Sequence, residues 1–332
     1  MPGRHKRRFL ALLGEVLLFL LFAQVSYGGK ASWQMKSVAV SPDGKVIAID
    51  VRNGSSSFIY KVSVDTGTAR RLTTATSGEE TSPAFSSDGK RIAYAYWPGP
   101  GARSRIMIVS VDGSGPPRQW SPSGVIDLSP VFSPDGKTIV FSRAESFGSD
   151  SPIAQSHAHE WKFYASDPDG ANVRELTAES FYMVSPPSIS SDGQKMVIVA
   201  EGLETSQQLR TYSITNPGPP LQILQPHVAN EMDHKNPIFA YPNYLPEGSI
   251  LFMAVNRRVD YDVYRLNPET GAIEKLTNAN GYATALRVSA DGNTAVFLRW
   301  RKNWLGELTS CEVLILDLHS RMLQPLQISG LP

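Results

Sequence analysis

The sequence predicts an all-β chain that folds as a six-bladed β-propeller. Six turn clusters ending in Asp-Gly or Glu-Gly recur along it, and their glycines are separated by 45, 47, 57, 55 and 44 residues. Each cluster separates a short apolar segment from an alternating apolar run, a pattern typical of two pleated strands joined by a hairpin. A period of this length indicates one small sheet that is repeated. The clusters are Ser41-Pro42-Asp43-Gly44, Ser86-Ser87-Asp88-Gly89, Ser133-Pro134-Asp135-Gly136, Ser190-Ser191-Asp192-Gly193, Leu245-Pro246-Glu247-Gly248 and Ser289-Ala290-Asp291-Gly292.

Four antiparallel strands are expected in each repeat. The first precedes the turn cluster, as in Val131-Phe132, and the second follows it, as in Thr138-Ile139-Val140-Phe141. The fourth ends in a Leu-Thr pair at Leu72-Thr73, Leu176-Thr177 and Leu276-Thr277. Third strands are predicted at Phe58-Ile59-Tyr60-Lys61-Val62, Ile106-Met107-Ile108-Val109, Trp161-Lys162-Phe163-Tyr164 and Tyr261-Asp262-Val263-Tyr264. Four-stranded sheets repeated in a ring form a propeller, which leaves only short edges.

These residues resemble a known family. Ser-Pro, then Ser-x-Asp-Gly, an Ile-x-Tyr strand and a Leu-Thr pair are similar to the WD40-like (PD40) repeats of the TolB-like six-bladed β-propeller. The resemblance covers nearly all of residues 29–332 and implies the propeller fold. Similar repeats occur in binding proteins, in prolyl-oligopeptidase-like enzymes and in tricorn-like proteases.

The first residues read as a leader. Arg4, Lys6, Arg7 and Arg8 precede the mostly apolar run from Phe9 to Val25, and small residues follow it. This pattern is typical of a secretory signal peptide. We therefore expect residues 1–28 to be a signal peptide, residues 29–332 to be the propeller, and the protein to be periplasmic or secreted. An uncleaved N-terminal anchor is the alternative.

Charge and cysteine content exclude several classes. The chain has 32 basic and 31 acidic residues, and without residues 1–28 the balance is 28 against 30, or −2. This near-neutral balance lacks the basic footprint of a nucleic-acid-binding protein. The single cysteine, Cys311, lies in an apolar stretch and is expected to be a buried core residue.

The connections between strands two and three, and between repeats, are long and irregular. They are expected to share one face of the ring, the loop face, whereas the tight turns occupy the other. Recognition residues concentrate on loops held by a rigid scaffold. Tryptophan and arginine are enriched in binding hot spots. The candidate binding residues are therefore Trp97, Arg257, Arg258, Trp300, Arg301 and Trp304. Alternatively, these tryptophans cover the ends of blades.

Two functions are left open. The first is a non-catalytic extracytoplasmic binding or scaffold protein, which presents the loop face to a protein, peptide or glycan of the cell envelope and needs no cofactor. It follows from a chain that six repeats fill, with no Gly-x-Ser-x-Gly elbow, phosphate-binding loop or dinucleotide fingerprint. The alternative is a metal-dependent propeller lyase or hydrolase acting on a carbohydrate or small ester. Its divalent metal would be held by histidines of two loops, His157, His159, His227 and His234.

Overall fold

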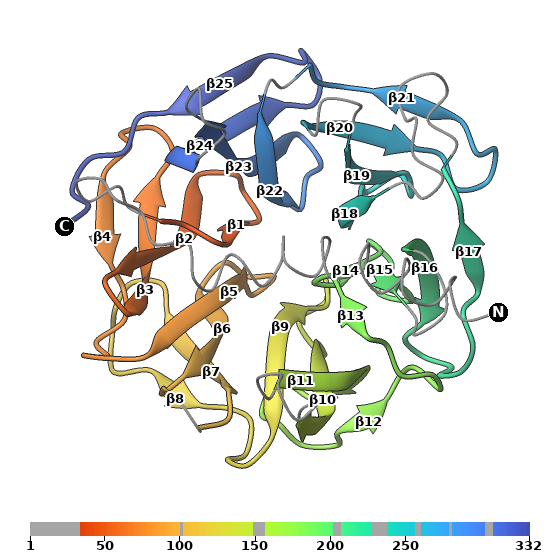
Figure 1. The fold of residues 1–332 in the computed structure, drawn as a ribbon, viewed down its shortest axis with the longest axis horizontal. Coiled ribbons are helices and arrows are strands. Elements are labelled where there is room, and N and C mark those ends of the chain that lie inside the picture. The colour runs from red at the N-terminus through yellow and green to blue at the C-terminus, as the bar shows by residue number, and fades with distance from the viewer. Residues whose placement is uncertain are drawn as a thin grey trace, which may run out of the picture. The chain divides into compact units, whose positions relative to one another are not determined.

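A computed structural model describes residues 34–99, 102–148, 157–201, 207–226, 238–255, 260–278, 281–302 and 308–332. These residues form β-strands, turns and irregular segments, and no helix occurs among them. An all-β, propeller-like fold is therefore confirmed (Figure 1). The leader, residues 1–28, lies outside the described residues.

The described strands follow the sequence repeats, four to a repeat except in the fourth, which has five. The first three repeats contain β1 (Val38–Val40), β2 (Val46–Asn53), β3 (Ser56–Ser63), β4 (Ala69–Arg71), β5 (Glu79–Phe85), β6 (Arg91–Trp97), β7 (Arg105–Ser110), β8 (Arg118–Gln119), β9 (Ile126–Phe132), β10 (Ile139–Gly148), β11 (His157–Ser166) and β12 (Arg174–Glu175). The last three contain β13 (Met183–Val184), β14 (Ser188–Ile189), β15 (Lys195–Glu201), β16 (Gln208–Ser213), β17 (Gln222–Leu224), β18 (Phe239–Tyr244), β19 (Ile250–Val255), β20 (Tyr261–Leu266), β21 (Ile273–Lys275), β22 (Tyr282–Val288), β23 (Thr294–Lys302), β24 (Leu308–Asp317) and β25 (Leu323–Leu326).

Hydrogen bonding groups the described strands into five sheets, not the six separate blades that the sequence predicts. Within each repeat the strands pair antiparallel from first to fourth, as predicted. The first two repeats share one eight-stranded sheet, because a parallel bridge joins Ser57 to Glu79. In the fourth repeat, Pro186 and Pro187 separate β13 from β14, since proline lacks the N–H that a ladder needs.

The repeats pack around a common centre. The first strands β1, β5, β9, β14, β18 and β22 lie nearest the middle of Figure 1. Contacts join β1 to β5, β5 to β9, β14 to β18, β18 to β22, and β22 to β1. Apolar clusters fill the spaces between neighbouring repeats. Ala93, Ile106 and Phe132, for example, share one cluster between the second and third.

Five of the six recurring turns, those with a serine and an aspartate, share one hydrogen-bond pattern. At the third turn, the Ser133 hydroxyl donates to Asp135 (2.6 Å) and accepts from the backbone N–H of Thr138 (3.0 Å). The Lys137 N–H donates to the same carboxylate at 3.0 Å. Gly136 closes the turn at φ +70°, a conformation that glycine adopts without a steric cost.

The Leu-Thr pairs fasten the fourth strand to the third. The hydroxyl of Thr177 accepts a hydrogen bond from the backbone N–H of Phe163 (3.1 Å), and that of Thr277 accepts one from Val263 (3.0 Å). Both threonines are buried. The hydroxyl thus satisfies a buried donor, which would otherwise cost stability.

The last repeat closes onto the first through the C-terminal segment. Beyond β25, the Ser329 N–H donates to the Gly67 carbonyl at 2.9 Å, and the Ala69 N–H donates to the Ser329 carbonyl at 2.8 Å. The sequence leaves two modes of closure open, an N-terminal strand near Trp33 on the last blade or side chains alone. The observed bonds follow neither, since Gln34 pairs with Arg52 of the first repeat and Trp33 lies outside the described residues.

An apolar cluster reinforces this closure. It joins Val38, Ile47 and Ile49 of the first repeat to Val296 and Val313 of the sixth. Cys311 on β24 packs against it, and burial raises the pKa of its thiol. Cys311 is therefore half-buried at the edge of the core, rather than fully buried as expected. Across the described residues, we find no helix with the length and apolar character that crossing a membrane requires.

Candidate binding site

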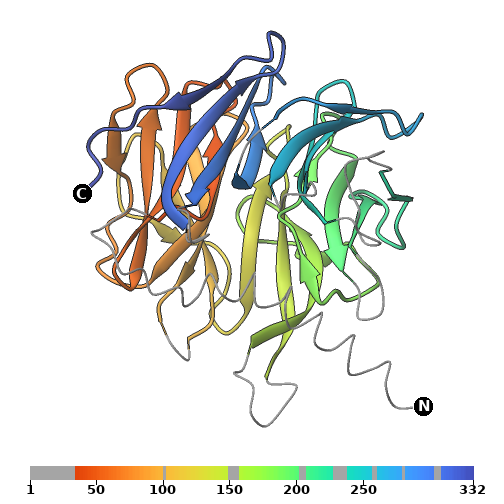
Figure 2. The same cartoon turned by 45° about the horizontal axis from the view of Figure 1, so that its top comes forward.

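The strand order places the tight turns and the longer connections on opposite faces of the ring. Every second strand starts at an Asp-Gly or Glu-Gly turn and ends at the loop face, where the first and third strands begin. The β10–β11 hairpin is the longest, with ten residues in each strand and pairing out to Gly148 and His157. The strands that reach the loop face can be followed in Figure 2.

Three exposed side chains of hot-spot type stand at the loop-face ends of second strands. Trp97 ends β6 and is 42% exposed, and Phe147, next to the end of β10, is 46% exposed. Arg301, next to the end of β23, has 64% of its side chain exposed, and its Nε donates to Glu312 at 2.7 Å. Phe147 is not among the binding residues predicted from the sequence.

Trp300 is placed differently from its neighbour Arg301. Its side chain is 5% exposed, and the residue pairs with Tyr282 and Cys311 in the adjacent strands. Successive residues of a strand point to opposite sides of the sheet, so one of this pair is buried when the other is exposed. The burial of Trp300 agrees with the alternative interpretation, in which the tryptophan covers the end of a blade. Arg257, Arg258 and Trp304 lie outside the described residues.

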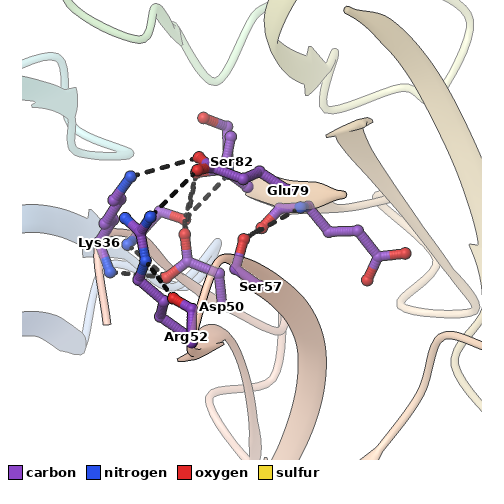
Figure 3. A network of polar contacts seen from close by, with 10 residues as sticks. Lys36, Asp50, Arg52, Ser57, Glu79 and Ser82 are labelled. Carbon is purple, nitrogen blue, oxygen red and sulfur yellow. Dashed lines mark hydrogen bonds and ion pairs between the residues drawn. The ribbon is translucent and has the colours of Figure 1, made fainter. Parts of the chain in front are cut away.

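Toward the ring centre, a buried carboxylate joins the first two repeats (Figure 3). Asp50 on β2 is 1% exposed. One of its oxygens accepts the backbone N–H groups of Lys36 (2.6 Å) and Ser37 (2.9 Å). The other accepts the hydroxyls of Ser37 (2.8 Å) and Thr81 (2.9 Å). Burial raises the pKa of Asp50, against the lowering effect of these donors.

Above Asp50, a surface carboxylate joins two cations. Glu79 at the start of β5 accepts from Lys36 Nζ and Arg52, each at 3.4 Å (Figure 3). All three side chains remain between 21% and 34% exposed. Such partly exposed pairs contribute little stability, typically about 0–1 kcal/mol.

A further position recurs on the innermost strands or directly before them, and we call it the inner belt. It lies four residues before each turn cluster and comprises Ser37, Ser82, Ser129, Pro186, Tyr241 and Ala285. In β5, β9, β18 and β22 this residue has φ between +50° and +62°, at a shift of strand register. Such bulges re-aim side chains and recur beside functional sites.

Other buried carboxylates have protein partners. Asp127 accepts both Nε and Nη2 of Arg143, at 2.7 and 2.9 Å. Glu80 accepts the Thr73 hydroxyl and the backbone N–H of Ile59. Burial raises the pKa of both carboxyl groups. These groups hold strands together, and the sequence gives no sign of them because their partners are far apart in the chain.

The predicted metal ligands are only partly described. His159 lies half-buried on β11, and His157 begins that strand. His227 and His234 fall outside the described residues. No group of three or more metal-ligating side chains occurs among the residues that the structure places. The metal site of the alternative function stays a prediction.

No protein-family model matches the sequence, and no curated protein sequence matches it. Solved structures match its fold. TolB from Acinetobacter baumannii has a TM-score of 0.62 at 18% identity, over 86% of this chain and 64% of that one. A protein named as TolB from Agrobacterium tumefaciens has a TM-score of 0.59 at 16% identity, over 80% and 86% of the two chains.

An enzyme propeller is also similar. Oligogalacturonate lyase from Vibrio parahaemolyticus has a TM-score of 0.56 at 13% identity, over 90% of this chain and 79% of that one. This chain spans less than two thirds of the Acinetobacter TolB, so the additional length of that protein has no counterpart in the match. At sequence identities this low, a structural likeness shows a shared fold and not a shared activity. On these likenesses and on the strand order, the chain has a TolB-like β-propeller fold.

Proposed function

We propose that this protein is a non-catalytic extracytoplasmic binding or scaffold protein. A six-bladed TolB-like ring would present its loop face to a protein, peptide or glycan of the cell envelope. The observation that carries the proposal is the set of exposed anchors at the ends of second strands, Trp97, Phe147 and Arg301. Aromatic and arginine side chains dominate binding hot spots. Rigid strands hold them at low entropic cost.

The leader supports the location. Its basic residues, apolar run and small residues are those of a signal peptide, so residues 1–28 would direct the ring out of the cytoplasm. The likeness to the two TolB structures supports the same scaffold type.

The test uses residues 29–332 as bait for solubilised envelope material. A loop-face variant carries Trp97→Ala, Phe147→Ala and Arg301→Ala. A control carries Ile223→Ala, Met322→Ala and Arg118→Ala, two exposed apolar residues and one exposed arginine of the outer strands and turns. We expect wild type and control to retain the same component and the loop-face variant to lose at least about tenfold of it, as for a hot spot worth more than 1.4 kcal/mol.

Equal retention by all three proteins would contradict the proposal. So would turnover of a substrate that the loop-face variant abolishes, because the site would then be catalytic. Circular dichroism and melting temperature would be matched across the three proteins beforehand, so that loss of fold is not read as loss of binding.

A second candidate is the metal-dependent lyase or hydrolase acting on a carbohydrate or small ester. The likeness to oligogalacturonate lyase and the position of His159 on the longest hairpin favour it. Metal analysis of protein purified without chelators tests it, with a His157→Ala, His234→Ala variant as comparison. Stoichiometric metal that the variant lacks would favour the enzyme, and metal-free wild type that gains no thermal stability from zinc, manganese, iron or calcium would exclude it.

A further inference from the structure

A lone arginine lies on the innermost strand of the sixth repeat. Arg287 is on β22, two residues after the inner-belt residue Ala285 and opposite Val296 in the strand register. β22 is among the strands that surround the ring centre in Figure 1. The side chain is half-buried. Burial lowers its pKa to about 10, so the guanidinium is still charged at neutral pH.

This guanidinium has no carboxylate partner among the described residues. Its hydrogen bond goes to the carbonyl of its own neighbour, with Nη1 of Arg287 donating to Leu286 at 2.9 Å. The Asn243 amide donates to that carbonyl as well, at 3.0 Å, so the oxygen serves two donors. Other arginines of this ring have carboxylates, as Arg143 has Asp127 and Arg210 has Glu179. A partly desolvated cation without a counter-charge costs free energy, which a bound anion would recover.

The remaining donors of Arg287 are not fully sealed from solvent. Among the described residues, the sealed side-chain nitrogens without a partner are the Nε atoms of Arg105 and Arg265, and no nitrogen of Arg287 is among them. An arginine with free N–H groups presents a planar fork that matches a carboxylate or phosphate.

The neighbouring polar groups leave this fork available. Tyr241 comes from the inner belt of the fifth repeat, and its hydroxyl is bonded by the backbone of Ala285. Burial raises the pKa of the Tyr241 phenol, while the charges of Arg287 and Asp50 act on it in opposite directions. The hydroxyl is therefore neutral at pH 7 and can donate a hydrogen bond. The carboxylate of Asp50 is already held by Lys36, Ser37 and Thr81.

We propose that Arg287, with the hydroxyl of Tyr241 beside it, binds the carboxylate or phosphate group of a small ligand between the innermost strands β18 and β22. This site goes beyond the loop-face function and does not depend on it. The ligand is defined by its oxyanion, which accepts two N–H donors of one guanidinium. A chloride ion lacks this shape and would bind less well.

The experiment compares acetate, phosphate and chloride at constant ionic strength and pH 7. Thermal unfolding is followed for the wild type, Arg287→Met and the exposed-arginine control Arg118→Met. In chloride, we expect Arg287→Met to melt at or above the wild-type temperature, because it removes a half-buried charge that has no carboxylate partner. In acetate or phosphate, we expect a rise for the wild type and the control that Arg287→Met lacks. Which of the two oxyanions acts distinguishes a carboxylate ligand from a phosphate ligand.

Three results would overturn the proposal. They are the same salt response in all three proteins, no response of the wild type to either oxyanion, and an Arg287→Met protein that melts well below wild type by the same margin in every salt. The last result would assign Arg287 a packing role only. If Arg287→Met does not fold, Tyr241→Phe takes its place. It should reduce the oxyanion-dependent rise, and an unchanged rise in that variant would count against the site.

Discussion

The hydroxyl of Ser37 accepts a hydrogen bond of 2.9 Å from the backbone N–H of Ser82, the same position one repeat later. Tyr241 and Ala285 repeat the relationship between the fifth and sixth repeats, where the backbone of Ala285 bonds the Tyr241 hydroxyl. A side-chain oxygen of one repeat thus accepts a hydrogen bond from the backbone N–H of the left-handed residue in the next repeat. Because Ser37 also donates to Asp50, this link continues into the buried network of the first repeat.

Replacing Ser37 with alanine should destabilise the ring. The Ser82 N–H would lose its acceptor and Asp50 would lose a donor, at an expected cost of about 1–2 kcal/mol. Urea unfolding followed by tryptophan fluorescence measures this. Ser129→Ala is the matched control, because it removes the hydroxyl of an inner-belt serine that has no side-chain hydrogen bond to the described residues. Equal losses in the two variants would show that the Ser37–Ser82 bond contributes nothing specific.

Asp50 should tolerate asparagine far better than leucine. Asparagine keeps one oxygen for the N–H groups of Lys36 and Ser37, and its amide can donate to the hydroxyls of Ser37 and Thr81. Leucine leaves two backbone donors without an acceptor, at about 3 kcal/mol or more. We expect Asp50→Asn to stay within about 1 kcal/mol of wild type at neutral pH. Comparable losses in the two variants would contradict this account.

The contribution of Asp50 to stability should change with pH in a definite direction. Burial raises the pKa of Asp50 in the folded protein, so the unfolded chain ionises first as the pH rises. The contribution of Asp50 to stability is therefore largest below its unfolded pKa of about 3.9 and falls as the pH rises through the folded pKa. The stability that Asp50→Asn loses relative to wild type should therefore be smallest at neutral pH and largest in acid. Unfolding free energies measured across this range test the prediction, and a difference independent of pH would contradict it.

The turn aspartates should act in the opposite direction. The Ser133 hydroxyl and other donors lower the pKa of Asp135, and Asp43, Asp88 and Asp192 are lowered in the same way. Their stabilisation is present above about pH 4 and is lost as the pH falls through the folded pKa. Asp135→Asn should therefore reduce the loss of melting temperature between neutral and acidic buffer. A profile that stays parallel to wild type would show that this turn does not take part in acid unfolding.

Local chemistry made most of this fold predictable. The turn at Asp135 and Gly136 needs a short carboxylate and a positive φ within a few residues, so the sequence records it directly. Alternating apolar residues likewise place β10 and β20 where they were expected. The separate blades were not predicted correctly, because the bridge between Ser57 and Glu79 depends on how two repeats meet.

The candidate site was less predictable. Trp97 and Trp300 were both predicted as binding residues because both are tryptophans near the loop face. Strand alternation and packing expose the first and bury the second. Asp50 and Arg287 gave no signal, because their environment comes from residues of other strands and repeats. Closure by the C-terminal segment was missed for the same reason, since Ser329 meets Gly67 only once the ring has formed.

Gly67 should be the most sensitive glycine of the closure. A Cβ atom there would lie 1.8 Å from the Gln327 carbonyl oxygen, so Gly67→Ala must displace the C-terminal segment. Gly271 is the matched control, because it holds the equivalent turn of the fifth repeat at φ +73° with nothing within 4 Å of an added Cβ. Both alanines bear the cost of positive φ, about 1 kcal/mol. Gly67→Ala should lose about 2 kcal/mol more of its unfolding free energy, as backbone overpacking does.

The residues beyond Leu326 should also become accessible to carboxypeptidase in Gly67→Ala, while those of Gly271→Ala stay protected. Similar stability and similar digestion in the two variants would show that the pairing of Ser329 with β4 does not hold the ring closed.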